Sequence, residues 1–334
     1  MLSFNYHKLL IVALVLLFSK EVIGAEIVIK FSHINTADSP KGLAAAHFKD
    51  LAEKLTKGKV RVDLYPDGEL FKDNEEMEAL QLNSVQMLAP SFSKFSSLGI
   101  HDFEVFDIPY LFRTSDELHR ITQGPIGRKL LGLLDPQGII GLGFWDNGFK
   151  NMSANKPVHT PSDMRGLKMR IQPSKVISVQ MTQLGAIPFP MPFFETFKYL
   201  NNGLIDGAET TPSLFYTLEL TNTQKYLTLT RHGYLGYVII ANKKFWNSLP
   251  AEIQIELVKA MNETSKFAND SAKVQNVADL DAIRNSGKTT VIELTEAEKK
   301  LWRDALLPVR KQMEGRIGKD LIDEIRRELP PASQ

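Results

Sequence analysis

Arg170 is the residue whose sequence context best suits it to hold an anion. The segment 167–171 alternates apolar and charged residues, which predicts a short strand with Arg170 on its polar face. Ligands of open α/β sheets meet the carboxyl ends of strands, and a planar guanidinium matches a carboxylate with two hydrogen bonds. Spacing alone leaves a second interpretation open, in which Arg170 forms a salt bridge at the surface or between domains.

Four other side chains could complete such a site. Lys41 falls in the first turn of a predicted helix, where its charge opposes the helix dipole and is better placed beside an anion. Lys150 follows the run 144–149, near the switch between the two halves of the chain. Ser91 follows a predicted buried strand and could donate a hydroxyl, while Phe193 could lie against a ligand. An ordinary solvated, turn or core position also explains each of these residues.

The sequence lacks the patterns that most enzymes need. The phosphate loop GxxxxGK[ST], the nucleophile elbow GxSxG and the zinc motif HExxH are absent, and the histidines lie far apart. The Gly-rich run 138–148 lacks the GxGxxG order of a dinucleotide site, so we predict that it forms turns. No catalytic residue, metal site or cofactor is therefore expected.

Length and composition describe a neutral globular protein. The chain has 334 residues, which predicts about two domains, and 43% of them are hydrophobic. Its 40 basic and 39 acidic residues give a net charge of +1, which argues against nucleic acid as a partner. The absence of cysteine excludes disulfides, thiolate metal sites and a cysteine nucleophile.

The N-terminus has the pattern of a secretory signal peptide. A short basic start, an apolar run at 9–18 and the small pair Gly24-Ala25 predict a leader over residues 1–25 that is cleaved after Ala25. A membrane anchor or a buried helix is the alternative, but ten apolar residues are too few to cross a bilayer. No second long apolar stretch follows, so the mature protein is expected to be exported and not to span a membrane.

Hydrophobic periodicity predicts an α/β protein. A β-α-β-α-β order opens the mature chain, a second such unit follows residue 146, and the C-terminal part is helical. Thr295 and Glu298 match a capping box at the start of the last long helix. Strands are predicted at 26–31, 60–65, 85–89, 167–171, 226–229 and 235–241, and helices at 39–57, 75–82, 174–184, 193–201 and 250–284.

Eight runs in order resemble one protein family. The chain is similar to the solute-binding subunits of tripartite ATP-independent periplasmic (TRAP) transporters, in particular the C4-dicarboxylate-binding (DctP) type, from about residue 27 to 320. The runs are KFSHINTADSPKG (30–42), ALQLNSVQMLAPSFSKF (79–95), VFDIPYLF (105–112), GPIGRKLL (124–131), FWDNGFK (144–150), MRIQPS (169–174), DGAETTPS (206–213) and QKYLTLTRHGYLGYVIIANKKFWNSLP (224–250).

The resemblance implies a type II periplasmic-binding-protein fold. In that fold two α/β lobes enclose a ligand cleft, and a long helix bridges both. The chain crosses between the lobes more than once, so each lobe is discontinuous. We assign residues 26–147 and 236–275 to lobe I, and residues 148–235 and 276–330 to lobe II.

The resemblance also implies roles for particular residues. In this family the arginine corresponding to Arg170 grips the ligand carboxylate, Lys150 ends a run beside the cleft, and Lys41 lies on the opposite lobe. Phe193 corresponds to an aromatic residue that lines the cleft. The family often has asparagine where this chain has Thr210, which is shorter and offers one donor instead of two.

Two further positions, His33 and Ser91, fall in runs that face the cleft from lobe I. The resulting hypothesis is a periplasmic receptor that binds a C4-dicarboxylate such as malate, succinate or fumarate, and delivers it to the small and large membrane permease subunits of a TRAP transporter. The main alternative is a receptor of the same kind for a keto acid, an aromatic acid or a sugar acid. A sensor partner and an exported enzyme are less well supported, because no catalytic constellation is present.

Overall fold

The structure, a computed structural model, describes residues 27–330. The predicted signal peptide, residues 1–25, lies outside the described residues. All nine described strands join one mixed sheet in the order β2-β1-β3-β8-β4-β7-β5-β6, with β9 paired to β8. The strands are β1 (Ile27–Ser32), β2 (Val60–Tyr65), β3 (Met87–Leu88), β4 (Ile139–Ala154), β5 (Lys168–Ile171), β6 (Ile187–Pro190), β7 (Gly207–Thr210), β8 (Tyr226–Asn242) and β9 (Thr290–Ile292).

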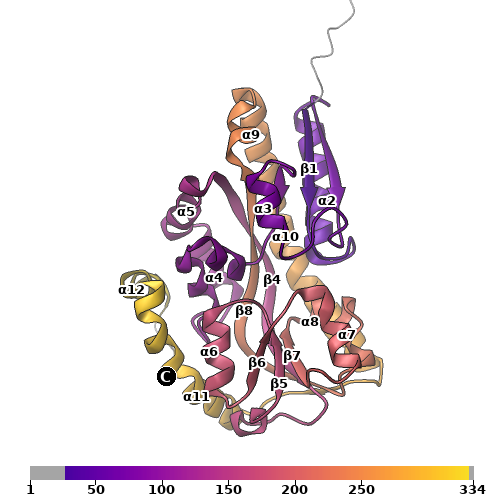
Figure 1. Cartoon of the computed structure of the whole chain (residues 1–334), viewed down its shortest axis with the longest axis vertical. Helices are drawn as coiled ribbons and strands as arrows, with labels where there is room; N and C mark the ends of the chain where they lie inside the picture. Colours follow the sequence, from indigo (N-terminus) through magenta and orange to yellow (C-terminus); the bar gives the residue numbers. More distant parts are fainter. Residues whose placement is uncertain (1–26, 331–334) are drawn as a thin grey trace, which may run out of the picture.

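Helices cover the sheet along most of its length (Figure 1). The α-helices are α2 (Pro40–Leu55), α3 (Glu76–Gln81), α4 (Ser115–Thr122), α5 (Pro125–Gly132), α6 (Lys175–Gln183), α7 (Thr196–Asn201), α8 (Pro212–Thr217), α9 (Lys243–Ser248), α10 (Ala251–Asn285), α11 (Glu296–Ile317) and α12 (Lys319–Glu328). Short 3₁₀ turns are η1 (Phe92–Leu98), η2 (His101–Asp107), η3 (Asp135–Gln137), η4 (Pro161–Met164), η5 (Phe193–Glu195) and η6 (Leu220–Asn222).

Local patterns predicted most of the elements around the first strands. Strands β1, β2 and β3 pair in parallel, as the β-α-β-α-β order predicted. The Ser39 side chain accepts a hydrogen bond from the Gly42 amide and caps α2, which satisfies one of the amides left free at a helix start. The capping box of Thr295 and Glu298 is also confirmed at the start of α11.

Two long antiparallel strands, β4 and β8, correct two predictions. The run 138–148, predicted to form turns, is the first part of β4, and the two strands predicted around 231–233 are one continuous β8. Register shifts in the pairing accommodate both irregular runs. Arg231 has a φ of 46°, which bends β8 without ending it.

The glycines of β4 are required by packing as well as by backbone freedom. A Cβ on Gly141 would lie 2.7 Å from the Leu131 side chain, so a larger residue cannot occupy that position without moving α5. Sequence alone shows a glycine but not the neighbour that requires it. This is why a Gly-rich strand resembles a turn.

Strands β4 and β8 run lengthwise through the centre of the molecule and join an upper and a lower half (Figure 1). The upper half holds β1, β2 and β3, and β3 pairs with the Ile240–Ala241 end of β8. The lower half holds β5, β6, β7 and β9, and β7 pairs with the 151–154 end of β4. The 35-residue α10 packs on α2 in the upper half and on α8 in the lower half. At 1.5 Å per residue it is about 50 Å long, as predicted for a bridging helix.

Three hydrophobic clusters form the core. One cluster belongs to the upper half and joins β1, α2 and the first part of α10. A smaller cluster lies in the lower half around β7 and α8. The largest cluster joins 77–134 to α6 and α11, so apolar packing crosses the level at which the halves meet. Within residues 27–330, no helix combines the length and hydropathy needed to cross a membrane.

A polar network ties the chain together where the halves meet. The Asn276 side chain of α10 donates hydrogen bonds to the carbonyls of Asn147 (2.5 Å) and Ala272 (2.7 Å), and it accepts one from the Ser213 amide (3.1 Å). Gly148, at a register shift of β4, has a φ of 145° and lies directly against Asn276. Strand β4 and helix α10, which both pass from one half to the other, are therefore linked by hydrogen bonds at this level.

Replacing Gly148 with alanine should destabilise the protein by about 1–3 kcal/mol. The new Cβ would lie 2.9 Å from the Asn276 side-chain nitrogen, on a backbone that favours glycine. Gly315→Ala in α11 is the matched control, because a Cβ there meets nothing within 4 Å. This substitution should increase the free energy of unfolding by about 0.5–1 kcal/mol, since alanine is favoured over glycine inside a helix. Urea unfolding measures both, and equal effects of the two substitutions would contradict the account of Gly148.

Candidate anion-binding site

A small cavity of about 30 Å³ lies between the two halves. The upper half and the lower half both supply charged side chains to its wall, and β8 supplies Leu235 and Tyr237. Six of the seven predicted site residues line it, and they come from six different elements or loops. These six are Lys41, Ser91, Lys150, Arg170, Phe193 and Thr210.

Arg170 is buried, and it forms no ion pair with a carboxylate of residues 27–330. It is 4% exposed, and its terminal nitrogen donates a hydrogen bond to the Met191 carbonyl at 3.0 Å. Its Nε has no partner among the described residues, and the guanidinium lies 5.7 Å from the Phe193 ring centre. Burial lowers the pKa of Arg170, and the charges of Asp73 and Glu209 oppose that shift. The guanidinium therefore keeps donor capacity for an anion in the cavity.

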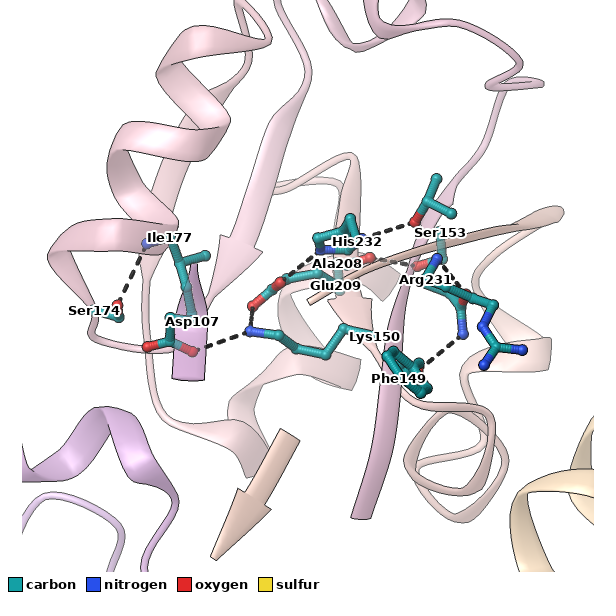
Figure 2. Close-up of polar contacts among 12 residues, drawn as sticks. Asp107, Phe149, Lys150, Ser153, Ser174, Ile177, Ala208, Glu209, Arg231 and His232 are labelled. Atoms are coloured by element: carbon teal, nitrogen blue, oxygen red, sulfur yellow. Dashed lines mark hydrogen bonds and ion pairs between the residues drawn. The ribbon is translucent and has the colours of Figure 1, made fainter. Parts of the chain in front are cut away.

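Lys150, in contrast, has carboxylate partners already. Its Nζ lies 3.2 Å from Glu209 and 3.5 Å from Asp107, and Glu209 also pairs with the His232 ring nitrogen at 3.0 Å (Figure 2). The His232 ring is held from its other side by the Thr230 hydroxyl at 2.7 Å. Sequence analysis did not single out Glu209, Asp107 or His232, because no local pattern connects residues so far apart in the chain.

The two carboxylates beside Lys150 differ in their acidity. Burial raises the pKa of Asp107 to about 6, although Lys150 opposes the shift. Burial acts on Glu209 too, but the Lys150 charge and the His232 hydrogen bond outweigh it and lower the pKa of Glu209 to about 2. Glu209 is therefore the counter-ion of Lys150.

The upper half contributes a second charged cluster. Lys41 is 2% exposed, and its Nζ lies 3.9 Å from the centre of the Tyr237 ring, a cation–π contact. Burial lowers the pKa of Lys41 to about 8, while the charges of Glu76 and Asp73 favour the protonated form. Lys94, which sequence analysis missed, pairs with Asp73 at 2.6 Å and also lines the cavity.

His33 is the one predicted site residue that does not line the cavity. Its ring packs edge-on to Phe31, with the ring centres 6.4 Å apart. Burial, together with the Lys41 charge, lowers the pKa of His33 to about 3, so the ring is neutral at physiological pH.

The charges of the wall favour a small dianion. Four cationic side chains and two carboxylates line the cavity, so the wall carries two positive charges in excess. The cations are Lys41, Lys94, Lys150 and Arg170, and the carboxylates are Asp73 and Glu209. The hydroxyl groups of Ser91 and Thr210, both buried, add polar atoms to the wall. Among the described residues, no group of three or more histidine or acidic side chains is arranged to hold a metal ion.

Comparison with known proteins places the chain in a family. The family model described as bacterial extracellular solute-binding protein, family 7, matches residues 31–316. The C4-dicarboxylate-binding periplasmic protein DctP of Rhodobacter capsulatus is 49% identical, over 94% of each chain.

Solved structures of solute-binding proteins have the same fold. A TRAP periplasmic solute-binding protein from Shewanella oneidensis with bound succinate has a TM-score of 0.88 and 38% identity, over 91% of this chain and 99% of its own. One from Pseudomonas aeruginosa with bound L-malate has a TM-score of 0.84 and 38% identity, over 86% of this chain and 99% of its own.

Fold and site together define a solute-binding receptor of the type II periplasmic-binding-protein kind. The chain belongs to family 7 of the bacterial extracellular solute-binding proteins, the family that contains the TRAP solute-binding proteins. The predicted fold class and family are thereby confirmed. The protein is a solute-binding receptor and not an enzyme, as its family shows.

Amide substitutions at the two carboxylates beside Lys150 should have opposite effects on stability at pH 8. Glu209→Gln should cost about 2–4 kcal/mol, because it removes the favoured counter-ion of a buried ammonium. Asp107→Asn should increase the free energy of unfolding by about 1–3 kcal/mol. The reason is that a buried carboxyl with a raised pKa destabilises the folded state once it ionises.

The two effects depend on pH in opposite ways. The contribution of Glu209 is present above about pH 4.5 and is lost as the pH falls toward 2. The gain from Asp107→Asn should appear as the pH rises from about 4 through 6 and be nearly absent at pH 4. Urea unfolding at pH 4 and pH 8 measures both; destabilisation by both substitutions at pH 8 would show that Lys150 needs both carboxylates.

Proposed function

We propose that the protein binds a C4-dicarboxylate such as succinate, malate or fumarate in the cavity between its two halves. The observation that carries this proposal is the excess of two positive charges in the wall, which a dicarboxylate dianion neutralises. A relative named for C4-dicarboxylate binding and neighbouring structures with succinate and L-malate support the same ligand class.

In the proposed complex, Arg170 takes one carboxylate and Lys41, with Lys94, takes the other. Arg170 is suited to its role because it is buried without a carboxylate partner, so it can offer two parallel hydrogen bonds. Lys150 is held by Glu209 and supplies charge and position to the middle of the site. The aromatic ring of Phe193 covers the hydrocarbon of the ligand.

Ser91 and Thr210 are proposed to donate hydroxyl hydrogen bonds to ligand oxygens. Charge-assisted hydrogen bonds contribute about 1.5–3 kcal/mol each. Three or four of them, less the cost of ordering, correspond to a dissociation constant near micromolar, or about −8 kcal/mol. His33, which lies outside the wall, is given no ligand contact.

Ligand binding is proposed to drive closure of two lobes, 26–147 with 236–275 and 148–235 with 276–330. The boundaries 147/148 and 235/236 face each other in the pairing of β4 and β8, at a register shift. A cavity of about 30 Å³ holds only two or three water molecules, so the lobes must part to admit a dicarboxylate. A dianion that bridges cations of both lobes binds the closed state better and stabilises it.

The proposed setting is the periplasm, where the receptor delivers its ligand to the small and large permease subunits of a TRAP transporter. The predicted leader and the periplasmic relative support this location. A second candidate ligand class is another organic acid, such as a keto, aromatic or sugar acid. The observation that favours it is Thr210, which leaves more space and one donor fewer than the asparagine common in the resembling proteins.

A thermal-shift screen should separate the two ligand classes. Succinate, malate and fumarate should raise the melting temperature, whereas the monocarboxylate butyrate should have little effect because it leaves one buried cation unpaired. The expected difference in affinity is at least about 100-fold, from the loss of one or two charge-assisted hydrogen bonds. Stabilisation by a sugar acid or keto acid alone would assign the site to the second class.

Arg170→Ala should abolish most dicarboxylate binding and leave the fold intact. The loss should be about 100-fold or more in affinity, because a bidentate ion pair is removed. Lys168→Ala is the matched control, since Lys168 is an exposed cation on the same strand and does not line the cavity. Isothermal titration calorimetry measures the affinities, and an unchanged affinity in Arg170→Ala would exclude Arg170 from the site.

A further inference from the structure

A second cavity, of about 330 Å³, shares no lining residue with the cavity between the two halves, which is called the dianion site below. It is formed by the loop 108–113, α11 and α12, on the side of the molecule opposite β1 and α2 (Figure 1). None of the side chains that line it is acidic. The wall instead combines apolar side chains with four arginines, which are Arg113, Arg303, Arg310 and Arg326.

The positive charge of this arginine pocket is only partly compensated. Arg113 pairs with Glu117 and donates to the Pro330 carbonyl, and Arg326 lies 3.9 Å from Asp323. Among residues 27–330, neither of the other two arginines, on α11, has a carboxylate within 4.0 Å. Guanidiniums gathered around one cavity repel each other, and an anion between them removes that cost.

Part of the lining of the arginine pocket is apolar, and hydrogen bonds hold Tyr110 in place there. Tyr110 has a φ of 55°, a strained conformation for a bulky residue. Its amide donates to the His232 carbonyl at 3.0 Å and its hydroxyl to the Thr230 carbonyl at 3.1 Å, so β8 fixes the ring. Leu307 of α11, in the wall, is 59% exposed. The pocket thus offers hydrocarbon contact beside its charges.

We propose that the arginine pocket binds an amphiphilic anion, with a phosphate or carboxylate group held by Arg303 and Arg310 and a hydrocarbon segment against Leu307 and Tyr110. Guanidiniums match both kinds of acid group with paired hydrogen bonds. The exposed leucine has no role in binding a small polar anion, but it covers a hydrocarbon chain. Such a ligand is either a free amphiphile or the headgroup region of an anionic phospholipid.

The test uses the full mature chain with two probes, and with inorganic phosphate as a control ligand that has no hydrocarbon segment. Dodecyl phosphate, kept below its critical micelle concentration, is titrated by calorimetry, and vesicles of equal parts phosphatidylglycerol and phosphatidylcholine are used in a flotation assay. The double variant R303Q/R310Q should weaken binding at least about tenfold, since two charged donors are removed. The double variant K299Q/K300Q, on the same helix and outside the pocket wall, removes the same charge and should stay within about twofold of the parent.

Each outcome decides the proposal. If R303Q/R310Q loses binding of dodecyl phosphate but not of vesicles, the result supports a free amphiphile. If it loses binding of vesicles but not of dodecyl phosphate, the result supports a phospholipid. Equal losses in the two double variants would overturn it, because net charge would then explain the binding. Failure of the parent protein to bind either probe, or binding of inorganic phosphate as tightly as dodecyl phosphate, would overturn it too.

The proposal is independent of the ligand of the dianion site. Neither Arg303 nor Arg310 lines that cavity, so the thermal shift produced by succinate should be the same in R303Q/R310Q and the parent. An unchanged succinate response also shows that the variant is folded. A negative result at the arginine pocket therefore leaves the proposed dicarboxylate function untouched.

Discussion

The uncompensated guanidinium of Arg170 is the constraint on which the site depends. A buried cation without a counter-ion is costly, and in the proposed complex a carboxylate of the ligand supplies the missing charge. The neighbouring Lys150 has the opposite arrangement, since Glu209 neutralises it permanently. In the proposed complex one cation therefore binds the ligand, while the other is held by a carboxylate of the protein.

The two halves contribute differently to the same cavity. In the lower half, cations are fixed by hydrogen bonds to carboxylates and carbonyls, as at Lys150 and Arg170. In the upper half, Lys41 rests on the face of Tyr237, a side chain of β8, and its carboxylate neighbours act over a longer range. The upper half also has a direct ion pair in the wall, between Lys94 and Asp73 at 2.6 Å, so the cations of both halves have fixed surroundings.

Much of this arrangement could be predicted from local sequence patterns. Alternating apolar and charged residues predict the strand that carries Arg170. Ser39 and Pro40 predict the start of the helix that carries Lys41. The charge network could not be predicted, because Asp107 and Glu209 meet Lys150 only after three separate segments have packed together.

The first part of β4 could not be predicted as a strand either. Its glycines are required by a neighbouring helix, but in the sequence they resemble turn residues. The resemblance to a family added which residues face the cavity, but it placed His33 among them, and that side chain lies outside the wall. Local chemistry identifies single residues, whereas their counter-ions depend on tertiary structure.

The pairing of β3 with β8 has a consequence for how the chain folds. Met87 meets Ala241, so the upper half cannot complete its sheet until a strand that is synthesised much later has arrived. Contacts between such distant positions slow folding, since a long loop must close before any contact energy is gained. A nascent chain of this design is therefore expected to complete its upper half only after β8 has been synthesised.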